Sequence, residues 1–302
     1  MEENVLVGGQ AVIEGVMMRT PNAFAVAVRK PSGEMAVLKE RLDLSAWKPW
    51  MRWPLLRGFL ILVHSMILGV RALNFSASVA IDEPERPAEG WKQRAAVALS
   101  FVLALAFGIC LFLFLPLYLT RLAAHFLPVL NNWILFNVVD GLIRVLFFLG
   151  YLGFIARMKD IHRIFQYHGA EHKVVHNWES GMGLTVENAR RFSRLHPRCG
   201  TSFLMFVMLV SIFVFTVFKW NSFLLLFLSR IILMPLISGI AYELIRISAR
   251  NVTNPFVVPF IKPGLWLQLI TTQEPSDDQL QVAIYSLEQA LGIEKQIKAQ
   301  AA

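Results

Sequence analysis

The sequence predicts an α-helical polytopic membrane protein with about four transmembrane helices, one interfacial helix and a small cytoplasmic lobe that contains an N-terminal β-hairpin. The first supporting observation is composition, because the 302 residues are 56% hydrophobic with a mean hydropathy of +0.53, which exceeds that of soluble domains. The second is the recurrence of apolar segments about 20 residues long, the length that crosses a bilayer. The third is a concentration of basic residues in one loop between such segments.

Residues 1–53 are expected to form a cytoplasmic cap. Phe24, Val26 and Val28 alternate with other residues, and a Pro-Ser-Gly turn separates them from a second extended segment. This alternation is typical of a β-hairpin. The glycine-rich segment 8–19 permits tight turns or close backbone approach, but it lacks the Gly-Lys-Ser/Thr sequence of a phosphate-binding loop.

An apolar helix is predicted at residues 54–75. Within it, Arg57, His64 and Arg71 recur every seven residues, which is about two helical turns, so the three side chains share one stripe. A single basic stripe on an apolar helix predicts an interfacial or re-entrant position on the membrane. The alternative is a fifth transmembrane span.

Four charges interrupt the apolar segments of the two predicted transmembrane pairs. Asp140 and Arg144 are four residues apart, so they can pair along one helix face. Arg230 and Glu243 are expected to pair with other helices or to lie near the membrane interface. Charges inside a bilayer are costly unless they are paired or hydrated, so a buried pair that fixes helix packing is favoured over an ion path.

Charge distribution predicts the topology. Loop 157–202 carries eight Lys and Arg residues, whereas the links 120–132 and 219–220 carry one each. The positive-inside rule therefore places this loop and both termini in the cytoplasm. The predicted segments are the cap 1–53, the interfacial or re-entrant helix 54–75, a linker 76–94, a first transmembrane pair 95–156, the His/Cys loop 157–202, a second pair 203–245 and a cytoplasmic tail 246–302.

Basic residues and the tail helix indicate the partners. The net charge is +8, and anionic lipid headgroups are the expected partner for these charges; no specific nucleic acid is expected. A membrane-protein partner and a homo-oligomer both stay open. In the tail, Ser276 and Gln279 form a capping box, and an amphipathic helix follows as far as Leu291. Its apolar stripe is expected to pack on the N-terminal cap.

The His/Cys loop predicts a divalent metal site, with zinc as the expected ion. His168 and His172 are four residues apart, so a helix places both rings on one face, and Glu171 precedes the second histidine. This is the H-x-x-E-H order of inverzincins, in which the imidazoles bind zinc and the glutamate is the catalytic base. A third ligand would come from Glu187 or Glu243.

A second grouping of the same loop is also possible. His196 and Cys199 have metal-ligand spacing, and together with two of His168, His172 and His176 they would complete a closed four-ligand zinc site. Such a site is structural, because no position stays open for water. The third alternative is a polar loop whose histidines bond one another and the lipid headgroups.

Four sequence strings together extend over nearly the full length: Val7–Arg19, Tyr167–Lys173, Leu195–Phe203 and Pro263–Gln268. These strings resemble those of the YqhQ-like bacterial membrane family. This family is a domain of unknown function whose members are often labelled predicted metal-dependent enzymes. The resemblance implies metal dependence and a bacterial inner-membrane location, and it names no substrate.

Two function hypotheses follow from these observations. The first is a metal-dependent hydrolase at the membrane surface, with Glu171 activating a metal-bound water. The second is a non-enzymatic scaffold or assembly factor that binds lipid or a protein partner, in which any metal is purely structural. A transporter that uses Asp140, Arg144 and Glu243 is a weaker third. Three protein ligands plus water would favour catalysis, and four protein ligands would favour a structural role.

Overall fold

The computed structural model describes residues 5–42, 49–81, 91–220, 222–251 and 254–301. Its N-terminal part is an antiparallel sheet in the order β1-β2-β3-β4. The predicted hairpin is the β3–β4 half of this sheet, and the glycine-rich segment supplies the other half. The strands are β1 (Gly8–Val12), β2 (Gly15–Arg19), β3 (Ala23–Arg29) and β4 (Met35–Arg41).

The central strand β2 lacks the alternation that identified β3 and β4. Val16, Met17 and Met18 are all buried, because helices cover both faces of the sheet. A strand buried on both faces has no polar side, so it cannot be recognised by a period of two. Gly15 is required here, since a Cβ atom would lie 2.2 Å from the carbonyl oxygen of Ala27.

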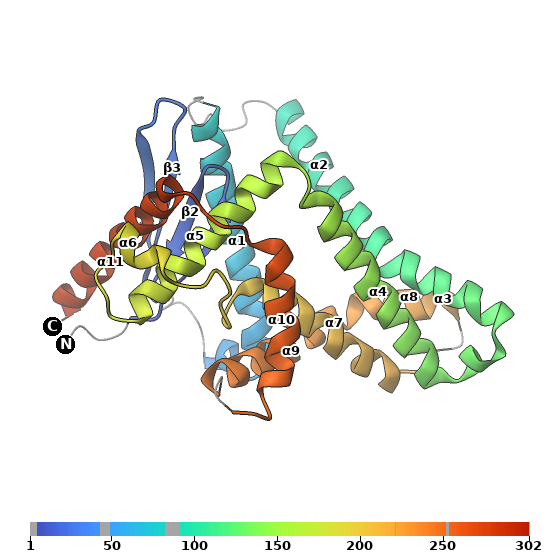
Figure 1. The fold of residues 1–302 in the computed structure, drawn as a ribbon. Coiled ribbons are helices and arrows are strands. Elements are labelled where there is room, and N and C mark those ends of the chain that lie inside the picture. The colour runs from blue at the N-terminus through green and yellow to red at the C-terminus, as the bar shows by residue number, and fades with distance from the viewer. Residues whose placement is uncertain (1–4, 43–48, 82–90, 221, 252–253, 302) are drawn as a thin grey trace.

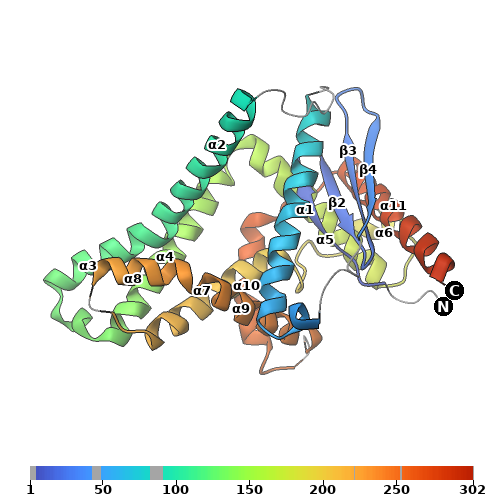
Figure 2. The same ribbon diagram turned by 180° about the vertical axis from the view of Figure 1, so that it is seen from behind.

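Three helices cover the sheet: α1 (Leu56–Ala80) on one face, and α5 (Lys159–Glu179) and α11 (Asp277–Ala301) on the other. We call this assembly, with the short helix α6 (Val186–Arg190), the sheet lobe. The lobe is a three-layer structure in Figure 1, and Figure 2 shows α1 on the opposite side of the strands. Alternate strand residues therefore belong to two separate apolar cores.

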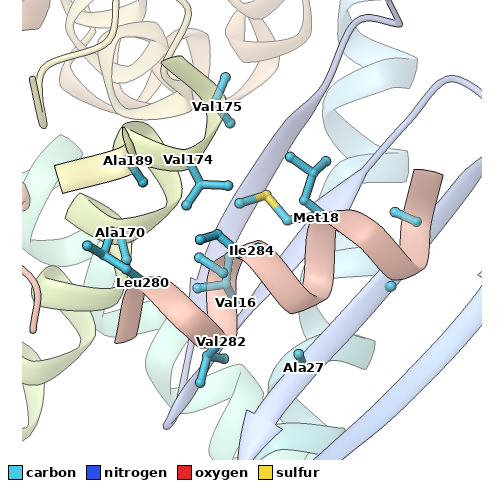
Figure 3. Packing of buried hydrophobic residues seen from close by; sticks show 14 of the residues in the cluster. Val16, Met18, Ala27, Ala170, Val174, Val175, Ala189, Leu280, Val282 and Ile284 are labelled. Atoms are coloured by element: carbon cyan, nitrogen blue, oxygen red, sulfur yellow. The ribbon is translucent and has the colours of Figure 1, made fainter. Parts of the chain in front are cut away.

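The tail helix α11 packs on the sheet, as its apolar stripe predicts. Leu280, Ile284 and Leu287 are buried, and Figure 3 shows Leu280 and Ile284 among side chains of the sheet and of α5. The capping box is present, because Ser276 N donates to Gln279 Oε1 at 2.9 Å. Near the other end of α11, buried Glu294 accepts from Thr20 Oγ1 at 2.8 Å. The first and last segments of the chain are thus joined.

The basic stripe of α1 has partners within the protein. Arg57 forms an ion pair with Glu243 at 2.5 Å, and Arg71 forms one with Glu40 at 2.9 Å. The second half of α1 packs Leu68 and Ala72 on the sheet. The stripe that suggested contact with lipid headgroups is therefore explained at two positions by internal carboxylates.

The apolar helices are α2 (Trp91–Ile109), the π-helical segment η2 (Cys110–Phe114), α3 (Leu115–Phe126), α4 (Trp133–Ile155), α7 (Gly200–Val217), α8 (Phe223–Ile232), α9 (Met234–Arg250) and α10 (Val258–Thr271). In the described ranges, four helices are long and apolar enough to cross a membrane: α1, Ala98–Phe126, α4 and α7. A fifth span results if α8 and α9 count as one. Helices α2, α3, α4, α7 and α8, which we call the helix bundle, extend away from the sheet lobe (Figure 1).

The predicted span 221–245 is broken between α8 and α9 by a bend of 46°. Pro235 lies in the first turn of α9. A proline lacks the N–H that would continue the helical bonding and clashes with the preceding turn, so a continuous helix is disfavoured at this point. The two helices together are long and apolar enough for one candidate span, as the composition predicted, but they are divided at this proline.

The charges inside the helix bundle are paired. Arg144 contacts Asp140 at 2.6 Å, and Arg230 contacts the same carboxylate oxygen at 3.2 Å. The two guanidinium groups also donate to Ser211 Oγ at 2.7 Å and Asn137 Oδ1 at 2.8 Å. The i,i+4 pair was predicted, and Arg230 joins it from another helix.

Candidate metal centre

Helix α5 carries the histidines and is continuous through the H-x-x-E-H sequence. His168, His172 and His176 recur at intervals of four, so they lie along one face of the helix. Gly169 does not interrupt the helix. Its lack of a side chain permits close contact, because a Cβ atom there would lie 2.0 Å from the backbone oxygen of Gln273.

His168, His172 and Cys199 form the first candidate metal group, which we call the His168 group. One nitrogen of each ring and the cysteine sulfur all lie within 4.8 Å of one another. His168 Nε2 is 3.3 Å from Cys199 Sγ, and the two imidazole centroids are 4.5 Å apart. The H-x-x-E-H pair was predicted, but the third donor is the cysteine and neither of the two glutamates proposed for that role.

Backbone carbonyls fix the orientation of both rings. His168 Nδ1 donates to the carbonyl oxygen of Thr271 at 2.7 Å, and His172 Nδ1 donates to that of Arg194 at 2.5 Å. Each ring therefore keeps a lone pair on Nε2. The buried Nε2 of His172 has no hydrogen-bond partner. Metal-binding histidines typically have this arrangement, with one nitrogen held by a carbonyl and the other free to coordinate.

The loop before α7 places Cys199 at the site. Cys199 is the N-cap of α7, and its sulfur accepts from Thr201 N at 3.4 Å. The side chain of Gln268 on α10 bonds both backbone groups of His196, at 2.7 Å to its nitrogen and 2.8 Å to its oxygen. The string Pro263–Gln268 thus has a structural role, because its last residue holds the loop that carries Cys199.

Burial determines the protonation of His172. Burial lowers the pKa of His172, whereas the neighbouring Cys199 acts in the opposite direction and is outweighed. The ring is therefore neutral at pH 7, which is the form that binds a metal. Two nitrogens and one sulfur suit zinc, and three protein ligands leave one tetrahedral position open.

Glu171 lies on the neighbouring face of α5, against Gly9 of β1. Burial raises the pKa of Glu171 to about 7, although the charge of His168 and a backbone hydrogen bond from Gly9 oppose this shift. The carboxylate is not one of the donors that converge with His168 and His172. It is nevertheless near enough to His168 to interact with it electrostatically.

His176, Glu179 and His196 form a second group, which we call the His176 group, and its donor atoms also lie within 4.8 Å of one another. Sequence reasoning named the two histidines but missed Glu179. Its position three residues after His176, on the same helical face, was the signal that could have identified it. His196 therefore does not complete a four-ligand site with Cys199, since the two residues belong to different groups.

Two predicted ligands lie outside both groups. Glu187 is exposed in the first turn of α6, where a carboxylate interacts favourably with the helix dipole. Glu243 is bound by Arg57 on α1. The ion pair with Arg57 explains why Glu243 lies outside the groups.

The predicted basic surface of the loop is mostly neutralised within the protein. Arg190 pairs with Asp277, Arg198 pairs with Glu179, and Arg194 donates to Thr272. Arg191 is exposed. The three paired arginines therefore connect the loop to neighbouring helices, and their charges do not form one continuous exposed surface.

Comparison with known proteins identifies a family of unknown function. A family model described as "Protein of unknown function (DUF1385)" matches residues 53–293, which include both histidine groups. The chain belongs to this family. The "Uncharacterized protein YqhQ" of Bacillus subtilis (strain 168) is 32% identical over 297 residues, which cover 95% of this chain and 92% of that protein. The predicted YqhQ-like relationship is confirmed. No solved structure matches this DUF1385 member.

Proposed function

We propose that this DUF1385 member is a zinc-dependent hydrolase that acts at the cytoplasmic surface of the bacterial inner membrane. The observation that carries the proposal is the His168 group, where two imidazoles oriented by backbone carbonyls converge with one thiol. Three protein ligands are typical of catalytic zinc sites, whereas structural sites have four. When bound, zinc lowers the pKa of a coordinated water and polarises a substrate oxygen.

In this proposal the protein's own groups have separate roles. His168, His172 and Cys199 hold the ion, and the carbonyls of Thr271 and Arg194 orient the two rings. Glu171 is the general base. Its pKa of about 7 suits a group that accepts and returns a proton near neutral pH.

The membrane location rests on the apolar helices and on the charge asymmetry of their connections. Four described helices, or five, have the required length and hydropathy. The basic loop that carries the site would face the cytoplasm. A Glu187→Cys variant, exposed in that loop, should resist a membrane-impermeant thiol reagent in intact cells. Asn131→Cys, in the opposite connection, should react. The reverse labelling pattern would overturn the topology.

Metal content and hydrolysis test the catalytic proposal together. Purified full-length protein should contain one zinc per His168 group, and Cys199→Ala should lose it, whereas Cys110→Ala is the matched control and should keep it. Glu171→Gln should keep the zinc and lose at least about 100-fold in hydrolysis of nitrophenyl esters and phosphodiesters. Zinc-loaded parent protein without hydrolysis of any of these probes, or a fully active Glu171→Gln, would count against the hydrolase.

A second candidate function is a non-enzymatic scaffold with structural zinc. The observation that favours it is that the His168 group joins α5 to the start of α7, and through Thr271 to the end of α10. Zinc removal would then loosen the contact between the sheet lobe and the apolar helices. Glu171→Gln would behave as the parent in every assay, and chelation would increase protease cleavage near Cys199.

A further inference from the structure

The last turns of α5 hold a group of donors that the proposed zinc site does not use. We propose that His176, Glu179 and His196 form a second divalent-cation site, separate from the His168 group. The proposal does not depend on hydrolase activity. It concerns a different donor set, two imidazoles and one carboxylate, and it predicts that the chain binds two cations.

Local geometry brings the three donors together. His176 and Glu179 are three residues apart at the end of α5, so both point to the same side of the helix. His196 approaches from the loop before α7, and its ring centroid is 4.5 Å from that of His176. His196 Nε2 lies 3.4 Å from Glu179 Oε2. This gap is long for a hydrogen bond, but a cation bound between the two atoms would contact both.

The hydrogen bonds leave a lone pair on His176, whereas His196 must change its tautomer to offer one. His176 Nε2 donates to the carbonyl oxygen of Leu195 at 3.0 Å, so the lone pair for a cation is on its Nδ1. His196 must carry its proton on Nδ1 when Nε2 binds the ion. That tautomer gives up only a 3.3 Å contact with the backbone N–H of Arg198. The required rearrangement is therefore small.

Arg198 has two opposing effects on this site. Its positive charge repels a cation, but its side chain is 33% exposed, and solvent screens such a charge. Its guanidinium binds Oε1 of Glu179 and leaves Oε2 directed towards His196. Carboxylate ligands are commonly oriented in this way by a hydrogen-bond partner. We infer that the orienting effect outweighs the screened repulsion.

A cavity beside Glu179, one of the three donors, is a further observation at this site. Its volume is about 240 Å³, and its lining includes Glu179 and Arg198. The remaining walls are apolar: Val5, Leu6, Val7 and Trp178. A cation held at the edge of this cavity can keep water or another ligand in its open positions.

The two groups differ in chemistry, and the difference makes them separable by experiment. The His168 group contains a thiol, and soft sulfur donors favour zinc. The His176 group has a carboxylate in that position, a combination that also accepts Fe²⁺ and Mn²⁺. Only the first group can give thiolate-to-metal charge-transfer absorption when it is loaded with Co²⁺.

Cobalt loading of the full-length protein in detergent tests the proposal. After chelator treatment and reloading with Co²⁺ alone, the parent should bind two ions per chain and show thiolate charge-transfer absorption. Glu179→Gln should bind one ion and keep that absorption. Cys199→Ala should bind one ion and lack the charge-transfer absorption. Glu187→Gln, the matched control with an exposed carboxylate, should behave as the parent.

The possible outcomes distinguish this proposal from the zinc site. Binding of two ions by Glu179→Gln, or of only one by the parent with its charge-transfer absorption intact, would overturn the second site. One ion in the parent without that absorption, lost in Glu179→Gln, would support the second site and remove the His168 group. His176→Gln is a second variant that should repeat the Glu179→Gln result. Unchanged thermal unfolding of the two metal-free variants verifies their folding.

Discussion

Two regions of this protein bury polar side chains in different ways. In the helix bundle, Asp140, Arg144 and Arg230 are at most 4% exposed, and ionised partners compensate one another. In the sheet lobe, His172 and Cys199 are comparably buried, but the His168 group has no counter-charge among its own donors. The bundle centre holds two guanidinium groups around one carboxylate, and the lobe centre holds neutral donors, of which His172 Nε2 has no hydrogen-bond partner.

The difference indicates what each region can bind. A buried charge requires a partner of opposite sign or a strong hydrogen bond, and the bundle centre supplies both from its own residues. A neutral imidazole can stay buried with one nitrogen bonded, at the cost of an unsatisfied atom such as His172 Nε2. Unsatisfied lone pairs that converge on one point are a site for a cation. The ion pairs of the bundle centre fit the predicted role of fixing helix packing, and the lobe centre is the candidate cation site.

The largest expected effect comes from removing the shared anion of the bundle. Asp140→Leu leaves two buried guanidinium groups without a counter-charge, so it should lower the free energy of unfolding by about 3–5 kcal/mol. Asp160→Leu, at the exposed start of α5, is the control. Denaturant unfolding in detergent measures both. Equal stability of the two variants would show that water or lipid headgroups compensate the arginines. The bundle centre would then not depend on its own carboxylate.

The second prediction concerns Glu171 and pH. Its pKa is about 7 in the folded protein against an ordinary 4.5, so its contribution is fully present below pH 4.5 and is lost as the pH rises through 7. The shift corresponds to about 3 kcal/mol. Metal-free Glu171→Gln should gain stability relative to the parent between pH 5 and pH 8, as measured by chemical unfolding. Glu187→Gln should show no such gain.

The third prediction tests the lone pairs directly. Zinc at 100 times its dissociation constant should raise the free energy of unfolding of the parent by about 2.7 kcal/mol. His172→Ala should lose the part of this gain that comes from the His168 group, because an incomplete donor set binds zinc weakly. His162→Ala, an exposed histidine at the start of the same helix, should keep it. Thermal unfolding with and without zinc measures the difference, and an equal response of both variants would exclude the His168 group.

The smallest expected effect on stability comes from breaking an exposed ion pair. Arg71 and Glu40 form an ion pair in which the side chains are 54% and 30% exposed. Glu40→Gln should change the free energy of unfolding by only about 0–1 kcal/mol. A loss of unfolding free energy as large as that of Asp140→Leu would mean that ion pairing itself, rather than burial of the charges, determines the destabilisation.

The sequence by itself determined the features that depend on neighbours along the chain. Alternation at Phe24, Val26 and Val28 identified one hairpin, the length of the apolar segments identified candidate spans, and Ser276 with Gln279 marked the start of α11. The i,i+4 spacing placed His168 and His172 on one face. These patterns are local, because the periods of strands and helices fix which residues share a face.

Only the tertiary structure decided which distant residues complete each site. Cys199 joins His168 and His172 because Gln268 of α10 holds the intervening loop, and Glu179 joins His196 through the same loop. Glu243, equally plausible from sequence, is bound by Arg57 instead. The sequence pattern did not identify strand β2, because both faces of this strand are buried. Such outcomes depend on contacts between segments far apart in the chain, and no local period encodes which of several suitable partners lies within reach.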